Sequence, residues 1–364
     1  MFKKWLMIGF GVLVVIMAIF YFTKEGEVLN PLAGWFDNSR NDHDMEITGF
    51  LPTWMVGKTK LYGKEIDRLI FLGIEVGDNG SLVWDSQSKK INNSDYLKIK
   101  SNVSKNGGKN IVGFKLFDDK KLDKLFKNQE AMDKLIDEIK AVVVSGDFDG
   151  VNIDFEFQND IFGVYQEDFL DFLAKLKEKN VGEVSVDVFA NTIIKARKNN
   201  ISQLLALSDK IIVMAYDFHR PGSVYAGPVA PIKSAIGERN IVEIYEKISQ
   251  IDDSERNKFI VAYPLYGYEW KTENKEYGSK ILGKWYQMAS MNRISQMTGM
   301  VEKWDELSMS PWLFFEEEGE IRQIYYENER SLKIKVDLAR QNKIKGVAFW
   351  ALGYEDKSLT FDKL

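Results

Sequence analysis

Eight short segments rich in β-branched and aromatic residues recur along the chain, and their spacing is the strongest constraint on its fold. They begin near Glu46, Arg68, Asn110, Gly150, Glu183, Lys210, Lys258 and Lys345. Amphipathic stretches separate most of them; Phe169, Phe172 and Leu176, for example, have helical spacing. Near-continuous apolar strands that alternate with helices indicate a parallel sheet covered on both faces. Eight such units predict an α/β fold, a (β/α)8 TIM barrel.

A doubly wound open sheet is the alternative fold, but no Gly-x-Gly-x-x-Gly follows any of the segments. One spacing is unusually long, because 87 residues separate Lys258 from Lys345. This stretch contains two strand-like runs on either side of the turn Glu318-Gly319-Glu320. We therefore expect a small α+β insertion at about residues 271–328, between strands seven and eight of the barrel.

The N-terminus carries an uncharged apolar run from Trp5 to Phe22, directly after Lys3 and Lys4. As a helix, these 18 residues would span about 27 Å, close to the thickness of a bilayer's hydrocarbon core. The lysines before the run favour a cytoplasmic N-terminus. We expect a single-pass anchor in the cell membrane at residues 1–22, a linker at 23–44 and an extracytoplasmic domain at 45–364. A cleaved signal peptide and a secreted protein are the alternative.

Composition removes several classes of chemistry. The chain has no cysteine and only two histidines, so thiolate metal sites, cysteine nucleophiles and multi-histidine metal centres lack ligands. Its net charge of -5 argues against nucleic acid as a partner, because phosphate binding needs a basic surface. We expect no metal, no cofactor, no nucleic-acid partner and a monomeric protein.

The segment that begins at Gly150 and ends with Glu156 is the most informative for function. Side chains alternate between the two faces of a strand, so Asn152, Asp154 and Glu156 share one face. Glu156 falls at the C-terminal end of the strand, where the active sites of barrel enzymes lie. Clustered carboxylates raise one another's pKa, which favours a protonated acid that can protonate a leaving oxygen.

Two other interpretations of this segment remain open. It has some features of a calcium-binding loop ending at Glu156, although its flanks alternate like a strand rather than continuing as helices. It is also compatible with a polar strand end whose groups are satisfied by their neighbours. Asp187, on strand five, is a further polar residue that can face inward, and its role is left open.

Polar and aromatic residues also gather at the ends of other strands. Any one of these rings is explained by core packing, whereas their conjunction at several strand ends indicates a mouth that binds sugar rings. The residues are Met214, Tyr216 and Asp217 on strand six, Tyr266 and Tyr268 after strand seven, and Trp350 on strand eight.

These motifs resemble those of glycoside hydrolase family 18. The family's motif Asp-x-x-Asp-x-Asp-x-Glu reads here Asp149-x-x-Asn152-x-Asp154-x-Glu156. The family's Met-x-Tyr-Asp motif and its strand-eight Trp match residues 214–217 and Trp350. The resemblance covers the chain from about Met45 to its end. Segments such as MAYDFHRPGSVYAGPVAP and YPLYGYEW are similar to the bacterial branch that cuts peptidoglycan, including spore-cortex lytic enzymes.

The resemblance implies retaining, substrate-assisted hydrolysis of β-1,4 bonds in N-acetylglucosamine-containing glycans, with peptidoglycan preferred and chitin next. Glu156 would be the general acid and then the base, Asp154 would hold the acetamide N–H, and Tyr216 would donate to the acetamide oxygen. The expected substrate-binding residues are Asn152, Asp149, Met214, Asp217, Trp350, Tyr266 and Tyr268. Because Asn152 replaces an Asp of the family, a catalytically silent chitinase-like carbohydrate-binding protein at the cell surface is the alternative.

Overall fold

The computed structural model describes residues 45–156, 165–235 and 238–364. The predicted membrane anchor and linker, residues 1–22 and 23–44, lie outside the described residues. Within the described ranges, no helix combines the length and the apolar character needed to cross a bilayer.

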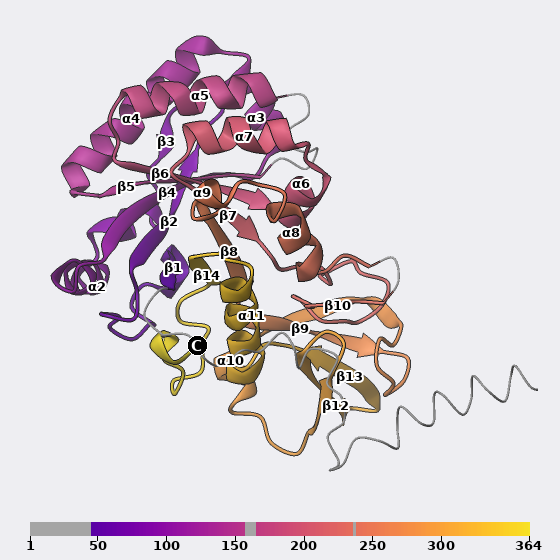
Figure 1. Cartoon of the computed structure of the whole chain (residues 1–364). Helices are drawn as coiled ribbons and strands as arrows, with labels where there is room; N and C mark the ends of the chain where they lie inside the picture. Colours follow the sequence, from indigo (N-terminus) through magenta and orange to yellow (C-terminus); the bar gives the residue numbers. More distant parts are fainter. Residues whose placement is uncertain (1–44, 157–164, 236–237) are drawn as a thin grey trace, which may run out of the picture. The chain divides into compact units, whose positions relative to one another are not determined.

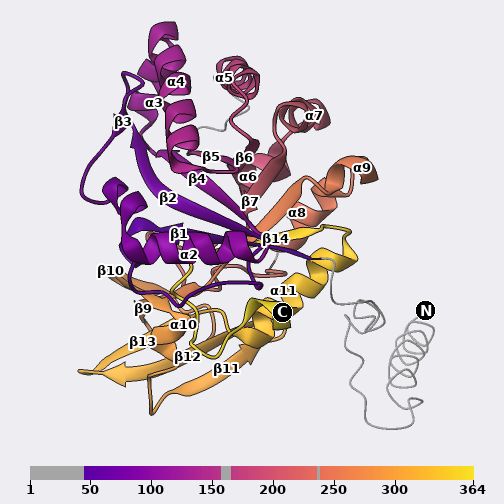
Figure 2. The same ribbon diagram turned by 90° about the vertical axis from the view of Figure 1, so that its left-hand side faces the viewer.

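Eight parallel strands form a closed barrel (Figures 1 and 2). The ends of the sheet meet because β1 pairs with both β2 and β14. The barrel strands are β1 (Glu46–Pro52), β2 (Arg68–Val76), β4 (Lys109–Leu116), β5 (Gly150–Phe155), β6 (Glu183–Phe189), β7 (Lys210–Met214), β8 (Phe259–Pro264) and β14 (Gly346–Trp350). A short strand, β3 (Leu82–Val83), pairs antiparallel with β2. The predicted (β/α)8 barrel and its eight strand segments are confirmed.

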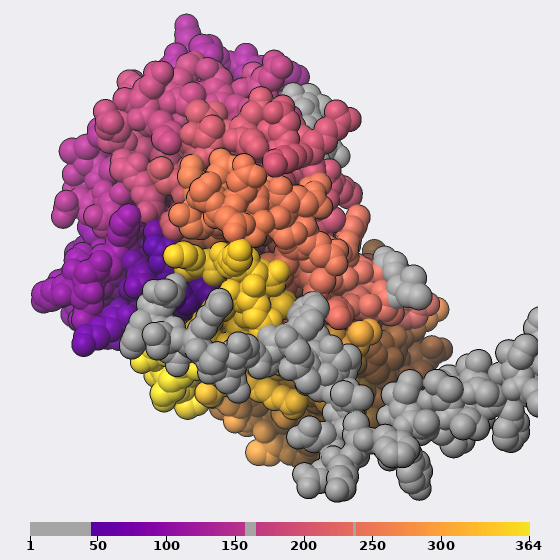
Figure 3. Space-filling view, viewed as in Figure 1, coloured from indigo at the N-terminus to yellow at the C-terminus, as the bar shows by residue number. Residues whose placement is uncertain are grey.

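Helices cover the outside of the barrel. They are α2 (Ser94–Lys105), α3 (Asp119–Phe126), α4 (Gln129–Gly146), α5 (Gln166–Glu178), α6 (Ala190–Lys195), α7 (Lys198–Leu207), α8 (Ile241–Ile248), α9 (Asp253–Arg256) and α11 (Glu329–Gln341), with short 3-10 helices at Thr53–Met55, Ser88–Asn92 and Phe361–Lys363. The apolar face predicted for α5 is buried, including Phe169 and Phe172. On the outer face, α9 and the end of α11 lie side by side (Figure 3), where Lys343 pairs with Asp253 at 2.7 Å.

A five-stranded antiparallel sheet lies between β8 and β14 in the sequence. Its strands are β9 (Tyr266–Thr272), β10 (Ile281–Ser290), β11 (Val301–Asp305), β12 (Ser310–Glu317) and β13 (Glu320–Tyr325), and its one short helix is α10 (Met291–Ile294). The sheet begins at Tyr266 rather than near residue 271, because the chain leaves the barrel directly after β8. The turn between β12 and β13 has positive φ angles at Glu318 and Gly319, which suits a tight hairpin.

The barrel interior is filled in layers, since every second residue of each strand points inward. Its middle layer is apolar and fully or almost fully buried. The cluster comprises Phe50, Ile70, Leu72, Ile111, Ile212, Ile260, Ala262 and Ala348. Polar side chains occupy the two ends of the barrel. The two ends differ in the charges of the side chains that meet there.

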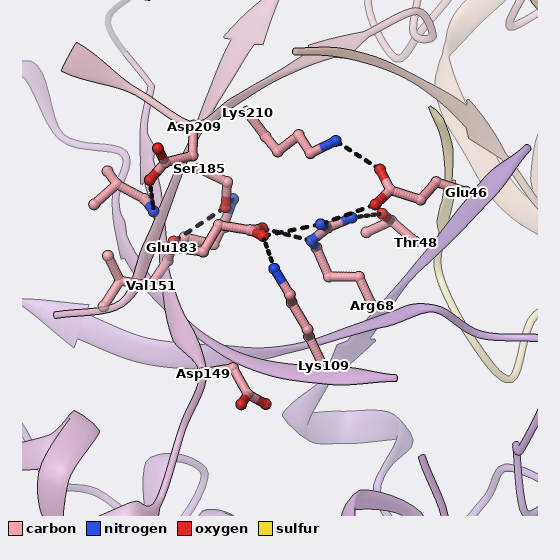
Figure 4. A network of polar contacts seen from close by, with 12 residues as sticks. Glu46, Thr48, Arg68, Lys109, Asp149, Val151, Glu183, Ser185, Asp209 and Lys210 are labelled. Atoms are coloured by element: carbon pink, nitrogen blue, oxygen red, sulfur yellow. Dashed lines mark hydrogen bonds and ion pairs between the residues drawn. The ribbon is translucent and has the colours of Figure 1, made fainter. Parts of the chain in front are cut away.

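A network of ion pairs closes the N-terminal end of the barrel (Figure 4). At its centre is Arg68, which is 2% exposed and donates to both carboxylate oxygens of Glu183, at 2.6 and 3.0 Å. Arg68 also contacts Glu46 at 3.4 Å, while Lys109 and Lys210 pair with Glu183 and Glu46 at 2.8 and 2.6 Å. Burial alone would raise the pKa of both glutamates, but Arg68 and the lysines lower it below the ordinary range. Five strands are thereby tied together at one end.

Removing Arg68 should destabilise the barrel strongly, because Glu183 would stay buried beside a less complete set of cations. We expect Arg68→Met to lower the free energy of unfolding by about 3–5 kcal/mol, measured by urea denaturation near neutral pH. Since the folded pKa of Glu183 and Glu46 is lowered, this stabilisation is present above their ordinary pKa and is lost as the pH falls. The difference between the wild type and the variant should therefore shrink in acid.

The double variant Arg68→Met/Glu183→Gln removes the uncompensated charge and should recover part of the loss. The control is Lys98→Met, since Lys98 and its partner Asp95 are 70% and 51% exposed and this substitution should leave stability unchanged. An Arg68→Met protein as stable as the wild type would contradict the role given to this network.

Candidate active site

A cavity of about 290 Å³ opens at the C-terminal end of the barrel. Most of the residues predicted to form the site line it: Asp154, Glu156, Met214, Tyr216, Asp217, Tyr266, Tyr268 and Trp350. They come from β5, β7, β9 and β14 and the turns that follow them. The spacing of polar and aromatic residues at strand ends thus brings together one site from distant parts of the sequence.

Asp154 sits in the floor of the cavity between two charged neighbours. The register of the parallel strands pairs Asp154 of β5 with Lys115 of β4 on one side. On the other side, Asn152 is paired with Ser185 of β6, so Asp187 lies beside Asp154 two residues further along. Asp154 is only 4% exposed, and its Oδ1 atom has no hydrogen-bond partner among the described residues. This buried oxygen thus keeps a hydrogen-bonding capacity that no described protein group uses.

Asn152 lies beneath the cavity instead of lining it. The side chain is fully buried, and its Nδ2 atom donates to Asp187 Oδ1 at 2.8 Å and to Ser185 Oγ at 3.2 Å. The structure therefore does not bring Asn152 to the cavity with the other predicted residues, because the next inward residue of β5, Asp154, covers it. Asn152 holds the carboxylate of Asp187 in place under the site.

Burial raises the pKa of the inward carboxyl groups at this end of the barrel. The pKa of Asp154 is raised by desolvation and by the charges of Asp187 and Glu156, and Lys115 offsets only part of this. The pKa of Asp187 is also raised, mainly by desolvation, although the hydrogen bond from Asn152 lowers it somewhat. Desolvation therefore favours the protonated form of these carboxyl groups.

Glu156 follows β5 directly and stays partly accessible in the cavity. Desolvation and the negative charge of Asp217 raise its pKa to about 7, while Arg220 and Lys115 act in the opposite direction. A carboxylic acid with a pKa near neutrality can both give and take a proton under physiological conditions. Among the carboxyl groups in the cavity, Glu156 combines such a pKa with partial accessibility, whereas Asp154 and Asp187 are buried.

Two tyrosines fix the carboxylate of Asp217 at the rim. Tyr266 donates to Asp217 Oδ1 at 2.5 Å, and Tyr268 donates to the same oxygen at 3.2 Å. Asp217 has φ of 60°, in the left-handed region that side chains other than Asn, Asp and Gly avoid. The ring of Tyr216 meets that of Tyr266 edge-on, with centroids 6.3 Å apart. Residues of β7 and of the antiparallel sheet are joined here.

Trp350 ends β14 and packs against the wall of the cavity. Its ring centroid lies 5.7 Å from that of Phe50 and 6.1 Å from that of Trp54. Trp54 in turn donates from Nε1 to the hydroxyl of Tyr354 at 2.8 Å. Indole and phenol rings held this way offer flat apolar faces to a sugar ring.

Asp149 lies at the opposite end of β5 and does not line the cavity. Its Oδ2 atom accepts a hydrogen bond from the backbone N–H of Asn110 at 2.8 Å. Seven residues of extended chain separate Asp149 from Glu156, which is about 23 Å. The structure therefore does not bring Asp149 to the cavity, and its carboxylate joins β4 to the start of β5.

Several lining residues were not predicted. They are Phe50, Trp54, Leu72, Lys115, Phe117, Met288 and Tyr354, together with Asp187, whose role the sequence left open. Trp54 and Phe117 follow β1 and β4, so the rule that picked out Trp350 at a strand end applies to them too. Met288 and Tyr354 have no such signal, because they reach the cavity only through the folding of β10 and of the C-terminal segment. Within the described ranges, no cluster of three or more His, Asp and Glu residues is arranged to hold a metal ion.

Comparison with known proteins agrees with this geometry. Residues 33–355 match the family described as glycosyl hydrolases family 18. The chain belongs to this family. It is thus a glycoside hydrolase, and the resemblance read from its motifs is confirmed, including that to the bacterial branch of sporulation and cortex-lytic enzymes.

Three relatives illustrate this placement. The uncharacterized glycosylase YvbX of Bacillus subtilis (strain 168) is 22% identical over 98% of this chain and 97% of its own length. The crystal structure of the spore cortex-lytic enzyme SleL of Bacillus megaterium has a TM-score of 0.67 and 20% identity, covering 88% of this chain and 73% of that one. The chitinase of Cycas revoluta in complex with (GlcNAc)3 has a TM-score of 0.74 and 17% identity, covering 87% and 98%. At these identities the two structures show the shared fold.

Replacing Asp217 by Asn should lower the pKa of Glu156, because the negative charge of Asp217 helps to raise it to about 7. The amide oxygen of Asn can still accept hydrogen bonds from Tyr266 and Tyr268, so the wall should keep its shape. A carbon-13 NMR titration of the Glu156 carboxyl measures this pKa directly, and the alkaline limb of glycan hydrolysis should move to lower pH with it.

The matched control is Asp253→Asn, which removes an exposed carboxylate on the outer face, 61% accessible, and should leave the titration of Glu156 unchanged. A pKa of Glu156 that stayed constant or rose in Asp217→Asn would contradict the electrostatic coupling across the cavity.

Proposed function

We propose that this protein hydrolyses β-1,4 glycosidic bonds of N-acetylglucosamine-containing glycans with retention of configuration and with help from the substrate's own acetamido group. The observation that carries the proposal is Glu156, an accessible carboxylic acid with a pKa of about 7 in a cavity that also contains Asp154 and Tyr216. Peptidoglycan is our first choice of substrate and chitin the second.

In the first step, protonated Glu156 gives its proton to the glycosidic oxygen as the bond to the anomeric carbon breaks. The acetamide oxygen of the same sugar attacks that carbon and forms an oxazolinium ion. Glu156, now a carboxylate, then takes a proton from the water that opens this ring, which restores the acid and retains the configuration. Only one carboxyl group of the protein needs to exchange protons with the substrate.

Asp154 and Tyr216 would orient the acetamido group for this attack. The unpartnered Oδ1 atom of Asp154 is placed to accept the acetamide N–H. Tyr216 is held neutral, because burial and the surrounding carboxylates raise its pKa well above the ordinary value, so its hydroxyl remains a donor for the acetamide oxygen. Fixing the internal nucleophile in this way replaces an enzyme nucleophile and supplies proximity and charge stabilisation.

Asp187 would take over the electrostatic role that the family assigns to the residue at position 152. An amide cannot hold a negative charge, but Asn152 donates to Asp187 at 2.8 Å and keeps this carboxyl next to Asp154. The pair Asp154 and Asp187 then shares its protons and its negative charge across two neighbouring strands. On this proposal, the site is catalytically active even though Asn152 replaces the Asp of the family.

Names of relatives support the choice of glycan. SleL is described as a spore cortex-lytic enzyme, and the Cycas revoluta chitinase binds (GlcNAc)3. The alternative function, a chitinase-like protein that binds glycans without cleaving them, has its support in Asn152 alone. We further propose that residues 1–22 anchor the protein in the cell membrane with the barrel outside, beside the wall, or are cleaved to release it.

Glu156→Gln should abolish hydrolysis and leave glycan binding intact, because the amide keeps the shape of the side chain but cannot donate the proton. Mass spectrometry of products from purified peptidoglycan and from chitin oligomers measures turnover and the bond cut, and proton NMR of the fresh products gives the anomeric configuration. Full activity in Glu156→Gln, or inverted products in the wild type, would refute the mechanism. Binding without turnover in the wild type would favour the silent alternative.

Tyr216→Phe should lower kcat by about 10²–10³, the usual cost of removing one hydrogen-bond donor from a developing charge. The Michaelis constant should change little, because the ring stays packed against Tyr266. The matched control is Tyr245→Phe, whose hydroxyl is buried against Tyr263 away from the cavity. Equal losses of activity in both variants would mean that Tyr216 acts through the fold and not on the substrate.

A further inference from the structure

Lys115 is a cation inside the cavity that the proposed mechanism does not use. Strand register places it between Glu75 of β2 and Asp154 of β5. Nevertheless its ammonium group forms no ion pair with any carboxylate among the described residues, and its one ring contact is with Phe117, at 5.6 Å from the centroid. Other partly buried lysines do have such partners: Lys60 pairs with Glu65, Lys210 with Glu46 and Lys271 with Glu320.

Two carboxylates on the side-hollow side of Lys115 already have other partners. Glu75 pairs with Lys121 at 2.8 Å, on the outer side of the strand end. Asp85, across a second hollow, accepts hydrogen bonds from the backbone N–H groups of Gln87 and Ser88, both at 2.8 Å. Among the described residues, Lys115 therefore has no carboxylate at ion-pairing distance, although its charge acts on the pKa of Asp154 and Glu156.

Two hollows meet at Lys115. The catalytic cavity of about 290 Å³ and a side hollow of about 170 Å³ share just two of their lining residues, Trp54 and Lys115. Trp54 is 39% exposed and offers part of its indole ring at this junction. A flat ring beside an unpaired ammonium group fits a sugar residue that carries a carboxylate, since the ring takes the sugar face and the ammonium takes the charge.

We propose that Lys115 binds a carboxylate carried by the glycan, such as the free lactyl carboxylate of an N-acetylmuramic acid unit that bears no peptide, with that sugar resting against Trp54. The inference builds on the proposed function and adds a basis for preferring glycan strands with peptide-free N-acetylmuramic acid over neutral chitin and over strands whose lactyl groups are amide-linked. The competing role for Lys115 is to offset the negative charge of Asp154 and Glu156, which would affect acidic and neutral substrates alike.

The test compares substrates that differ only in this charge. One is a tetrasaccharide of alternating N-acetylglucosamine and N-acetylmuramic acid with free lactyl carboxylates, and the other is the same tetrasaccharide with each carboxylate converted to its methylamide. We measure kcat/KM on both for the wild type, Lys115→Met and Lys115→Arg. The ratio of the two values isolates recognition of the carboxylate from any general effect on the catalytic acid.

In Lys115→Met the preference for the acidic tetrasaccharide should fall about tenfold or more, the range expected for loss of one charge-assisted hydrogen bond. Lys115→Arg should keep most of the preference, and Lys98→Met, on the exposed face of α2, should keep all of it. An unchanged ratio in Lys115→Met would overturn the inference and leave Lys115 with the offsetting role.

Affinity measurements separate this inference from the proposed function. In Glu156→Gln protein, calorimetry should show tighter binding of the acidic tetrasaccharide, and adding Lys115→Met should remove that advantage. If the wild type cleaved neither substrate but this binding difference was present, hydrolysis would fail as the function and the carboxylate site would stand. Equal affinities for both tetrasaccharides would refute the site whatever the enzyme cleaves.

Discussion

Closure of eight parallel strands into a barrel is the constraint on which the rest of this structure depends. Once the sheet is closed, every second residue of each strand must fit into a narrow interior, and no inward side chain can escape to solvent except at the two ends. Apolar residues such as Ile70 and Ile212 fill the middle. The polar residues of β1, β2, β5 and β6 are thereby sorted to one end or the other.

The two ends handle buried carboxylates in opposite ways. At the N-terminal end, Glu183 receives two hydrogen bonds from Arg68, and its pKa falls although the group is buried. At the C-terminal end, Asp154 has an acidic neighbour in Asp187 and no ion pair, so burial raises its pKa. The same desolvation thus gives permanently ionised structural groups at one end and proton-holding groups at the other. The difference lies in the placement of Arg68, Lys109 and Lys210 at the N-terminal end.

Strand periodicity and the position of motifs at strand ends were sufficient to predict the barrel, its strands and half of the residues that line the cavity. They placed Asp154, Glu156 and Tyr216 together although 60 residues of sequence separate Glu156 from Tyr216. The residues of one sequence motif are not all brought to the cavity. Asp149 and Asn152 belong to the same motif as Glu156, but the motif runs along a strand, and only its last two polar residues reach the cavity. The role of Asp187 needed the register between β5 and β6, which a single sequence does not contain.

The position of Lys115 follows from what the catalytic acid requires. A cation bound to Glu156 as closely as Arg68 is bound to Glu183 would favour the ionised form and lower the pKa of Glu156 below neutrality, which would remove the proton that hydrolysis needs. Lys115 is close enough to lower the pKa of Glu156 and Asp154 but pairs with neither. Its ammonium group can therefore form an ion pair with an anion that arrives with the substrate. Such an ion pair would weaken the effect of the ammonium charge on the pKa of Glu156. A substrate carboxylate at Lys115 would then raise the pKa of Glu156 further while the glycan is bound.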